Sequence, residues 1–199
     1  MAATLTQQME EAINSIKEAT TTYLRNKRLE EALALYNSSD YLQKQWEYHA
    51  EKYHISERFV KKAMVWFRPS KCINLNGFKP LEEGTNQVYI VFFYNAEDKV
   101  IYSKPGTTKR LITKRITEEL GTYRDNGACY AKVMRLWDVG EIPPPGLESA
   151  LRSYYIQKHP KNFKDNDRFE DLEISLEEAD CIQANYAAGR LFNLSKEGE

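Results

Sequence analysis

The sequence predicts an α+β fold in which a small antiparallel sheet packs against helices and follows an all-helical N-terminal segment. Two observations lead to this prediction. Apolar residues recur at helical spacing along the first third of the chain, whereas a continuous apolar run, typical of a buried strand, begins at Val88. Beyond that run, strand-like and helix-like patterns alternate, which favours layers of helix and sheet around one core.

Composition places the chain among ordinary globular proteins. Its 199 residues are 42% hydrophobic and 12% aromatic, with a formal net charge of -1. The first fifteen residues carry acids where a secretion signal needs a basic start, and no apolar run approaches the length of a membrane span. We therefore expect a protein that is not secreted and has no membrane partner. The chain has three cysteines, which are too widely spaced for a metal site: Cys72, Cys129 and Cys181. We expect all three to be free thiols.

The N-terminal segment, residues 1–72, reads as three helices. Residues 4–37 have a helical apolar period with a potential break near Asn26, and the Asn-Ser-Ser-Asp stretch that follows is a stop-and-restart signal. Further helices are predicted over 41–53 and 57–67, and Pro69 ends the last of them.

The remaining two-thirds of the chain contain the predicted sheet. Residues 73–85 are rich in Gly, Pro and polar side chains and are predicted to be a linker, which leaves 86–199 as a second domain. Ser175 and Glu178 form a capping box that opens the last helix. The other predicted elements are strands 88–94 and 99–103, a helix 107–120, a strand 129–139, a helix 147–158 and a polar loop 160–173.

Residues 46–66 fit a helix-turn-helix pattern, in which a second helix enters a DNA groove. A small residue in the first helix, an apolar residue in the turn and a branched residue in the second helix stand where the pattern needs them: Ala50, Ile55 and Val60. His54 begins the turn where Gly is usual, and Ser56 can cap the second helix. The cations on that helix are candidates for DNA contact: Arg58, Lys61 and Lys62. Three helices packed through the same apolar residues are the alternative.

A second basic region lies at 99–115, where six cations stand without an acid among them. Such a run creates a local positive field even in a chain of slightly negative net charge, and we count part of it as candidate DNA-binding residues. The alternative is a solvated basic face. The candidates are Lys109, Arg110 and Lys114.

Four features in the second domain occur in an order that resembles the GIY-YIG nuclease superfamily. They are the sequence VYI at 88–90, the sequence KPGTT at 104–108, Arg115 nine residues after Gly106, and Glu148 in a later helix. The likeness covers about residues 86–165 and is closest to a phage-associated branch whose second motif reads approximately K-I-G-x-T. It implies a β-β-α-β-α core.

The resemblance also implies roles for individual residues. Tyr89 matches the tyrosine of the first motif, and either Tyr102 or Lys104 the first position of the second. Arg115 matches the catalytic arginine, which clamps phosphate with its planar fork, and Glu148 the carboxylate that binds Mg²⁺. Because Glu148 opens a helix after a run of three prolines, we expect it to face Arg115 and Tyr89 across the phosphate. A late polar residue of the family has two candidates here, Asn162 and Asn166.

The chain departs from the family pattern at four positions: Gln87, Val88, Pro105 and Glu119, the last standing where many relatives have His. The resemblance implies an Mg²⁺-dependent DNA endonuclease in the cytoplasm of a bacterial or phage-infected cell. A second reading is a DNA-binding or scaffold protein that has the fold without turnover. In a third, the N-terminal helices dock a protein partner or form a homodimer.

Overall fold

The computed structural model describes residues 5–37, 61–62, 64–66, 68–140, 144–164 and 168–189. Most of the predicted helix-turn-helix lies outside these residues, including Ala50, His54, Ile55, Ser56, Arg58 and Val60. Asn166 lies outside them as well.

The N-terminal part begins with two packed helices, α1 (Leu5–Lys17) and α2 (Thr22–Asn37). The sequence predicted one helical stretch with a break near Asn26, but the break comes earlier. Three consecutive threonines follow Ala19, and the Thr21 hydroxyl accepts a hydrogen bond of 3.1 Å from the backbone N–H of Leu24. Thr21 therefore acts as a cap that starts α2.

The described strands form one mixed sheet in the order β1-β4-β2-β3-β6-β5. Every neighbouring pair is antiparallel except β1 and β4, which are parallel. The strands are β1 (Ile73–Asn74), β2 (Gln87–Tyr94), β3 (Val100–Thr108), β4 (Tyr130–Asp138), β5 (Phe163–Lys164) and β6 (Arg168–Glu170).

The central hairpin of this sheet confirms a sequence prediction. β2 pairs with β3 along its whole length, from Gln87 opposite Thr108 to Tyr94 opposite Val100. The connecting turn is closed by the Asn95 side chain, whose Oδ1 accepts from the backbone N–H groups of Glu97 and Lys99. β2 is flanked by β3 and β4, and its continuous apolar run is buried on both faces.

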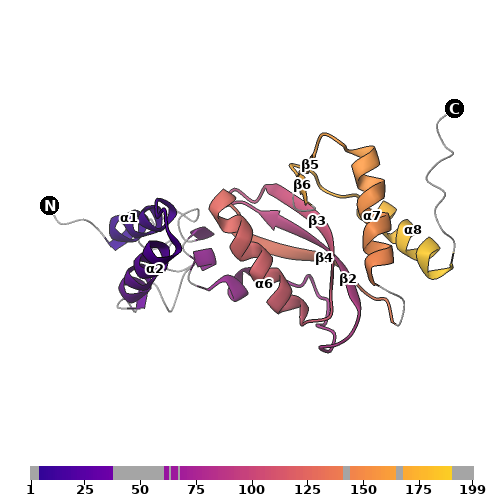
Figure 1. Cartoon of the computed structure of the whole chain (residues 1–199), viewed down its shortest axis with the longest axis horizontal. Helices are drawn as coiled ribbons and strands as arrows, with labels where there is room; N and C mark the ends of the chain where they lie inside the picture. The colour runs from indigo at the N-terminus through magenta and orange to yellow at the C-terminus, as the bar shows by residue number, and fades with distance from the viewer. Residues whose placement is uncertain are drawn as a thin grey trace.

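Helices cover both faces of the sheet, so that β2 presents alternate side chains to two separate cores (Figure 1). On one face, Tyr89, Val91 and Phe93 pack against α6 (Ile112–Tyr123). On the other, Val88, Ile90 and Phe92 pack against α7 (Pro144–Lys158) and α8 (Leu176–Ala187). The side chain of Ser175 accepts from the backbone N–H of Glu178 at 3.4 Å, which confirms the predicted start of α8.

The core on the α6 face extends to the N-terminal helices. Ile16, Val65 and Trp66 belong to the same buried hydrophobic cluster as the residues between the sheet and α6. The guanidinium of Arg124, in the 3-10 turn η2 (Arg124–Asn126) after α6, lies 4.1 Å from the centre of the Trp66 ring. The described N-terminal residues are thus packed onto the sheet layer.

Several element boundaries differ from the sequence prediction, and α7 begins at Pro144 instead of 147. Residues 107–108 end β3, and α6 begins only at Ile112, because β-branched Thr107 and Thr108 continue the ladder with β2. The predicted linker 73–85 starts with β1, preceded by the 3-10 turn η1 (Pro69–Cys72), and the predicted loop 160–173 contains β5 and β6.

Candidate functional site

The site is built around Tyr89 on β2 and the glycine that faces it. Gly106 of β3 lies opposite Tyr89 in the antiparallel ladder. A Cβ atom at this glycine would lie 2.4 Å from Cζ of the Tyr89 ring, well inside contact distance. The glycine of the KPGTT sequence therefore lets the Tyr89 ring lie flat across β3, and it directs the phenol towards α6.

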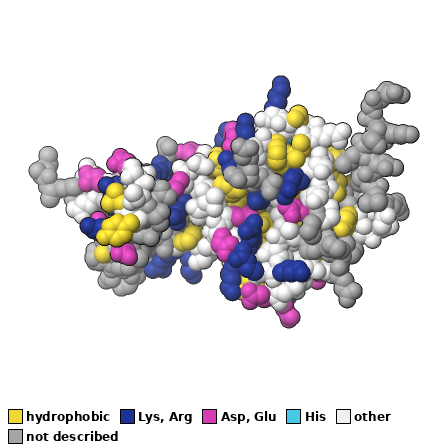
Figure 2. Space-filling model, viewed as in Figure 1, with side chains coloured by type: hydrophobic (Ala, Val, Ile, Leu, Met, Phe, Trp, Pro, Cys, Tyr) yellow, Lys and Arg dark blue, Asp and Glu magenta, His cyan; other side chains and the backbone are white. Residues whose placement is uncertain are grey.

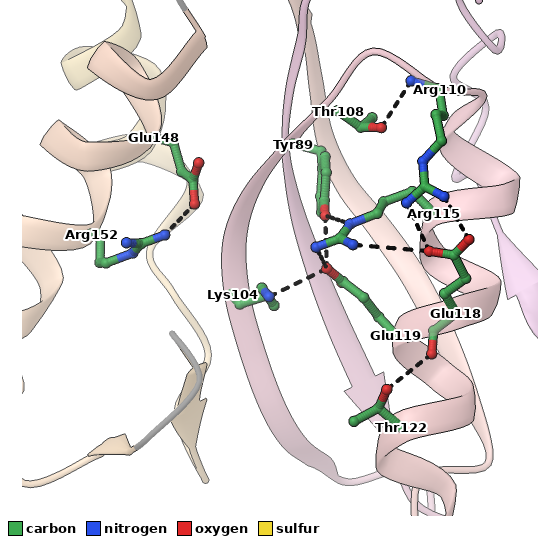
Figure 3. A network of polar contacts seen from close by, with 10 residues as sticks. All are labelled: Tyr89, Lys104, Thr108, Arg110, Arg115, Glu118, Glu119, Thr122, Glu148 and Arg152. Atoms are coloured by element: carbon green, nitrogen blue, oxygen red, sulfur yellow. Dashed lines mark hydrogen bonds and ion pairs between the residues drawn. The ribbon is translucent and has the colours of Figure 1, made fainter.

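The Tyr89 hydroxyl meets a carboxylate and an arginine from α6 (Figure 3). It donates a hydrogen bond of 2.9 Å to Oε1 of Glu119 and accepts one of 3.2 Å from Nε of Arg115. Arg115 and Glu119 are one helical turn apart, and Nη2 of the arginine lies 2.9 Å from the same Oε1. Lys104 on β3 completes the group, with its Nζ 3.3 Å from that oxygen. We call these four residues the Glu119 cluster.

The Glu119 cluster is largely shielded from water, with Arg115 at its outer side. The side chains of Glu119 and Lys104 are 7% and 10% exposed, whereas that of Arg115 is 33% exposed. Oε2 of Glu119 is buried and has no hydrogen-bond partner among the described residues. One carboxylate thus balances two cations in a poorly hydrated setting, where charge interactions are stronger than in water.

The environment of Tyr89 fixes the protonation state of its phenol. Burial raises its pKa far above the ordinary tyrosine value, and the neighbouring Glu119 charge raises it further, outweighing the opposite effect of Arg115. At neutral pH the phenol is therefore a hydrogen-bond donor and not a base.

The two candidates for the second-motif position, Tyr102 and Lys104, have different surroundings. Lys104 and Tyr102 both face α6, but only Lys104 contacts Glu119. The Tyr102 ring lies against Tyr123, with ring centres 5.0 Å apart, and is part of the hydrophobic core. The position next to Tyr89 is therefore occupied by a lysine.

Glu148 lies apart from this cluster. It is on α7, whose neighbouring residues Leu147 and Leu151 pack on the face of the sheet opposite α6. Its carboxylate pairs with Arg152 one turn along the same helix, and Figure 3 shows that pair separate from the contacts around Glu119. The predicted arrangement, with Glu148 facing Tyr89 and Arg115, is therefore not the one observed.

The Mg²⁺ implied by the resemblance does not fit the Glu119 cluster. Two cations already engage the single carboxylate there, and they would repel a further positive charge. Within the described ranges, no three His, Cys, Asp or Glu side chains come together as a potential metal site. Glu148 as a lone metal ligand stays a prediction from the resemblance.

Two of the three predicted DNA-binding cations in the run 99–115 are paired with acids. Figure 2 shows lysine and arginine side chains interleaved with acidic ones over α6. Arg110 makes two hydrogen bonds to Glu118, of 2.7 and 2.8 Å, and Lys114 lies 3.5 Å from Glu83. Lys109 is exposed. Because Arg110 and Lys114 are paired with acids, the basic run 99–115 is less cationic in the fold than in the sequence.

The two remaining DNA-binding candidates that the structure describes lie just before Trp66. Lys61 donates a hydrogen bond of 2.8 Å to Oδ1 of Asp98 at the β2–β3 turn. Lys62 is half-buried. Lys61 therefore ties the N-terminal part to the hairpin, a role the sequence did not predict.

Glu119 and Arg168, both on the α6 face of the sheet, were not predicted as functional. Glu119 was noticed only as a departure from the family pattern, although its position four residues after Arg115 places both on one helix face. Arg168 on β6 reaches the same face of the sheet only through strand pairing, which local sequence does not reveal.

Asn162 was a candidate for the late polar residue. Its side-chain amide donates a hydrogen bond of 2.9 Å to the backbone carbonyl of Glu170.

Comparison of the chain with protein-family models, with curated proteins and with solved structures gives no match. None of the helices in the described part of the chain is both long and apolar enough to cross a membrane.

Proposed function

We propose that this chain is a DNA endonuclease with a GIY-YIG-like core, and that the Glu119 cluster is where it holds the scissile phosphate. The observation that carries the proposal is the meeting of Tyr89, Lys104 and Arg115. These residues come from three separate sequence motifs, and all three contact one carboxylate oxygen. The order β2, β3, α6, β4, α7 is also the order that the resemblance implies.

Arg115 is suited to bind a phosphate while it keeps its internal contacts. A guanidinium has five N–H donors in a planar fork. One is directed to Tyr89 and one to Glu119, and Nη1 lies 4.0 Å from the half-exposed Glu118, beyond hydrogen-bond distance. The side chain is one-third exposed. Arg115 can therefore place its outer N–H groups on the non-bridging oxygens of a phosphodiester, where they stabilise charge that develops during cleavage.

Lys104 and Tyr89 support this contact from within. Lys104 adds a positive charge in a region with little water, which lowers the energy of a neighbouring phosphate. The protonated Tyr89 phenol orients Arg115 by accepting its Nε–H. These side chains bind and orient the phosphate, and we assign no step to a metal ion.

Plasmid cleavage tests the proposal. Supercoiled plasmid is incubated with the wild-type chain and with Arg115→Gln, with and without Mg²⁺. We expect nicking by the wild type and a loss of about 10²–10³-fold in rate for Arg115→Gln, the usual effect of removing one donor to developing charge. Arg135→Gln is the matched control, because Arg135 pairs with Asp180 at the α8 side of the sheet. Equal rates for wild type and Arg115→Gln would refute the assignment.

A second candidate function is DNA binding without cleavage. It is favoured by the pairing of Glu119 with Lys104 and Arg115. This pairing neutralises the two cations that a scissile phosphate would need for its cleavage. In that case the protein would bind DNA with an affinity that falls steeply with salt, and no plasmid would be nicked under any metal condition.

A further inference from the structure

A third cation, Arg168, faces the Glu119 cluster from the neighbouring strand. It is the first residue of β6, which pairs antiparallel with β3 through Tyr102 opposite Glu170 and Ser103 opposite Phe169. Continuing this register by one residue on each strand places Arg168 opposite Lys104. Residues directly opposite each other in an antiparallel pair point to the same face. Arg168 therefore faces α6, as Lys104 does.

The Arg168 side chain is held in place by aromatic rings. Its guanidinium carbon lies 4.9 Å from the centre of the Tyr102 ring and 5.4 Å from that of Tyr123. A guanidinium stacked on aromatic rings loses less conformational freedom when it binds a ligand, because its plane is already oriented. The rings therefore preorganise this arginine.

The protein contacts of Arg168 use only part of its hydrogen-bonding capacity, although they include a hydrogen bond with the Tyr123 side chain. Nη2 lies 3.4 Å from Oε1 of Glu170, a long contact to a residue on the same strand. Its Nε is buried and has no partner within the part of the chain that the structure describes. The Arg168 side chain is 15% exposed, so a ligand oxygen can reach the part of it that faces solvent.

The charges of Arg168 and of the Glu119 cluster act on one phenol. Burial and the Glu119 carboxylate raise the pKa of Tyr123, while the charge of Arg168, its hydrogen bond and the charge of Arg115 act in the opposite direction. Tyr123, in the last turn of α6, is thus within electrostatic reach of both arginines. Lys104, Arg115 and Arg168 bring three positive charges from three elements to this face, and Glu119 contacts only the first two.

We propose that Arg168 is a second phosphate-binding arginine, which contacts the phosphate next to the one held by Arg115 and so positions the DNA strand. This inference rests on the proposed function. Successive phosphates of a strand recur at regular short intervals, so a second cation beside the first engages a neighbouring phosphate. Contacts of this kind fix the register of the strand without reading its bases.

The test compares Arg168→Gln with the wild type on a short duplex whose cut site has first been mapped. The substrate is made with normal phosphates or with an uncharged methylphosphonate at either flanking position. We expect Arg168→Gln to raise KM about tenfold with a smaller change in kcat, and to reduce the salt slope of binding by about one. One flanking methylphosphonate should weaken wild-type binding about tenfold and leave Arg168→Gln unchanged. Arg135→Gln should match the wild type in both measurements.

Arg168→Lys is a second variant, which keeps the proposal testable if Arg168→Gln does not fold. It keeps the charge without the planar fork, so it should retain the wild-type salt slope while its KM rises severalfold. The inference is overturned if Arg168→Gln has the wild-type KM and salt slope. It is also overturned if a folded Arg168→Lys has the wild-type KM. A wild-type protein whose DNA binding is indifferent to salt would overturn the proposed function, and this inference with it.

Discussion

At the scale of single residues, Glu119 has the most unusual position in the molecule. Its carboxylate is almost fully buried, and three side chains converge on one of its oxygens. This carboxylate contacts the same two cations that a phosphate oxygen would bind. We infer that Glu119 keeps Lys104 and Arg115 oriented when no DNA is bound, at the expense of affinity for DNA.

Glu119→Gln separates these two effects. The change leaves Lys104 and Arg115 without their shared negative charge, so the free energy of unfolding should fall by up to about 3–5 kcal/mol, the usual effect of breaking a buried pair. DNA binding should tighten by about tenfold, because one repulsive charge beside the phosphate has gone. Thermal unfolding and a binding titration measure the two quantities.

Glu118→Gln is the matched control for Glu119→Gln. It removes the same charge from the adjacent residue of α6, but Glu118 is half exposed, bonds to Arg110 and lies 4.0 Å from Nη1 of Arg115 on the outer side of the cluster. Its effect on stability should stay below about 1 kcal/mol, as for other surface pairs. If Glu119→Gln binds DNA no more tightly than Glu118→Gln does, Glu119 does not compete with phosphate.

Tyr89 should make the fold sensitive to high pH. Because its pKa is raised in the folded state, the folded chain keeps this proton while the unfolded chain loses it above pH ~10. The resulting stability is fully present below pH ~10 and is lost as pH rises further, by up to about 1.4 kcal/mol per pH unit.

Tyr89→Phe removes this contribution. Urea unfolding at several values between pH 8 and 12 should show that the variant loses less stability with rising pH than the wild type does. The variant also lacks the hydrogen bonds to Glu119 and Arg115, so it should be the less stable protein at pH 8. Parallel pH curves for the two proteins would mean that Tyr89 titrates normally.

At the scale of elements, the long strands and helices could be predicted from the sequence, and the short strands could not. The apolar run 88–94 and the periodic helix after it have enough residues to show a pattern. β1 and β5 have two residues each, and they exist because a neighbouring strand offers backbone partners. Such strands have no periodicity of their own, so 73–85 and 160–173 read as linker and loop.

The candidate site divides in the same way. Tyr89, Lys104 and Arg115 could be predicted because each belongs to a motif with a fixed spacing. The contribution of Arg168 depends on β6 pairing with β3 more than sixty residues earlier, which only the tertiary register determines. Glu148 was expected in the cluster because it follows a proline run at the start of a helix, but the apolar residues of α7 anchor that helix on the other face.

The capping box of α8 provides a test at the element scale. Ser175→Ala removes the side-chain oxygen that accepts from the Glu178 N–H, and should lower the free energy of unfolding by about 1 kcal/mol. Urea denaturation measures the change. Ser149→Ala, on the exposed side of α7, is the control and should stay within about 0.5 kcal/mol of the wild type. Equal values for the two variants would show that the cap contributes nothing.

At the scale of the whole molecule, one hydrophobic cluster joins parts that the sequence assigns to separate domains. The cluster includes Ile16 of α1, Trp66 and the side of β2 that carries Tyr89. Lys61 adds a polar contact from the same N-terminal part to Asp98 at the β2–β3 turn. If this cluster is cooperative, the N-terminal helices stabilise the face of the sheet on which the Glu119 cluster lies.

Ile16→Ala tests that coupling, because Ile16 is fully buried in α1 and lies outside both the sheet and the Glu119 cluster. Removal of its side chain should lower the free energy of unfolding by about 2–5 kcal/mol, through lost burial and the cavity left behind. Native-state hydrogen exchange shows which elements lose stability. In one cooperative unit, the amides of Val91 and Phe93 in β2 lose protection together with those of α1. Loss of protection in α1 alone, with β2 unchanged, would show that residues 1–72 unfold independently and that the predicted boundary near the start of the sheet is a true domain boundary.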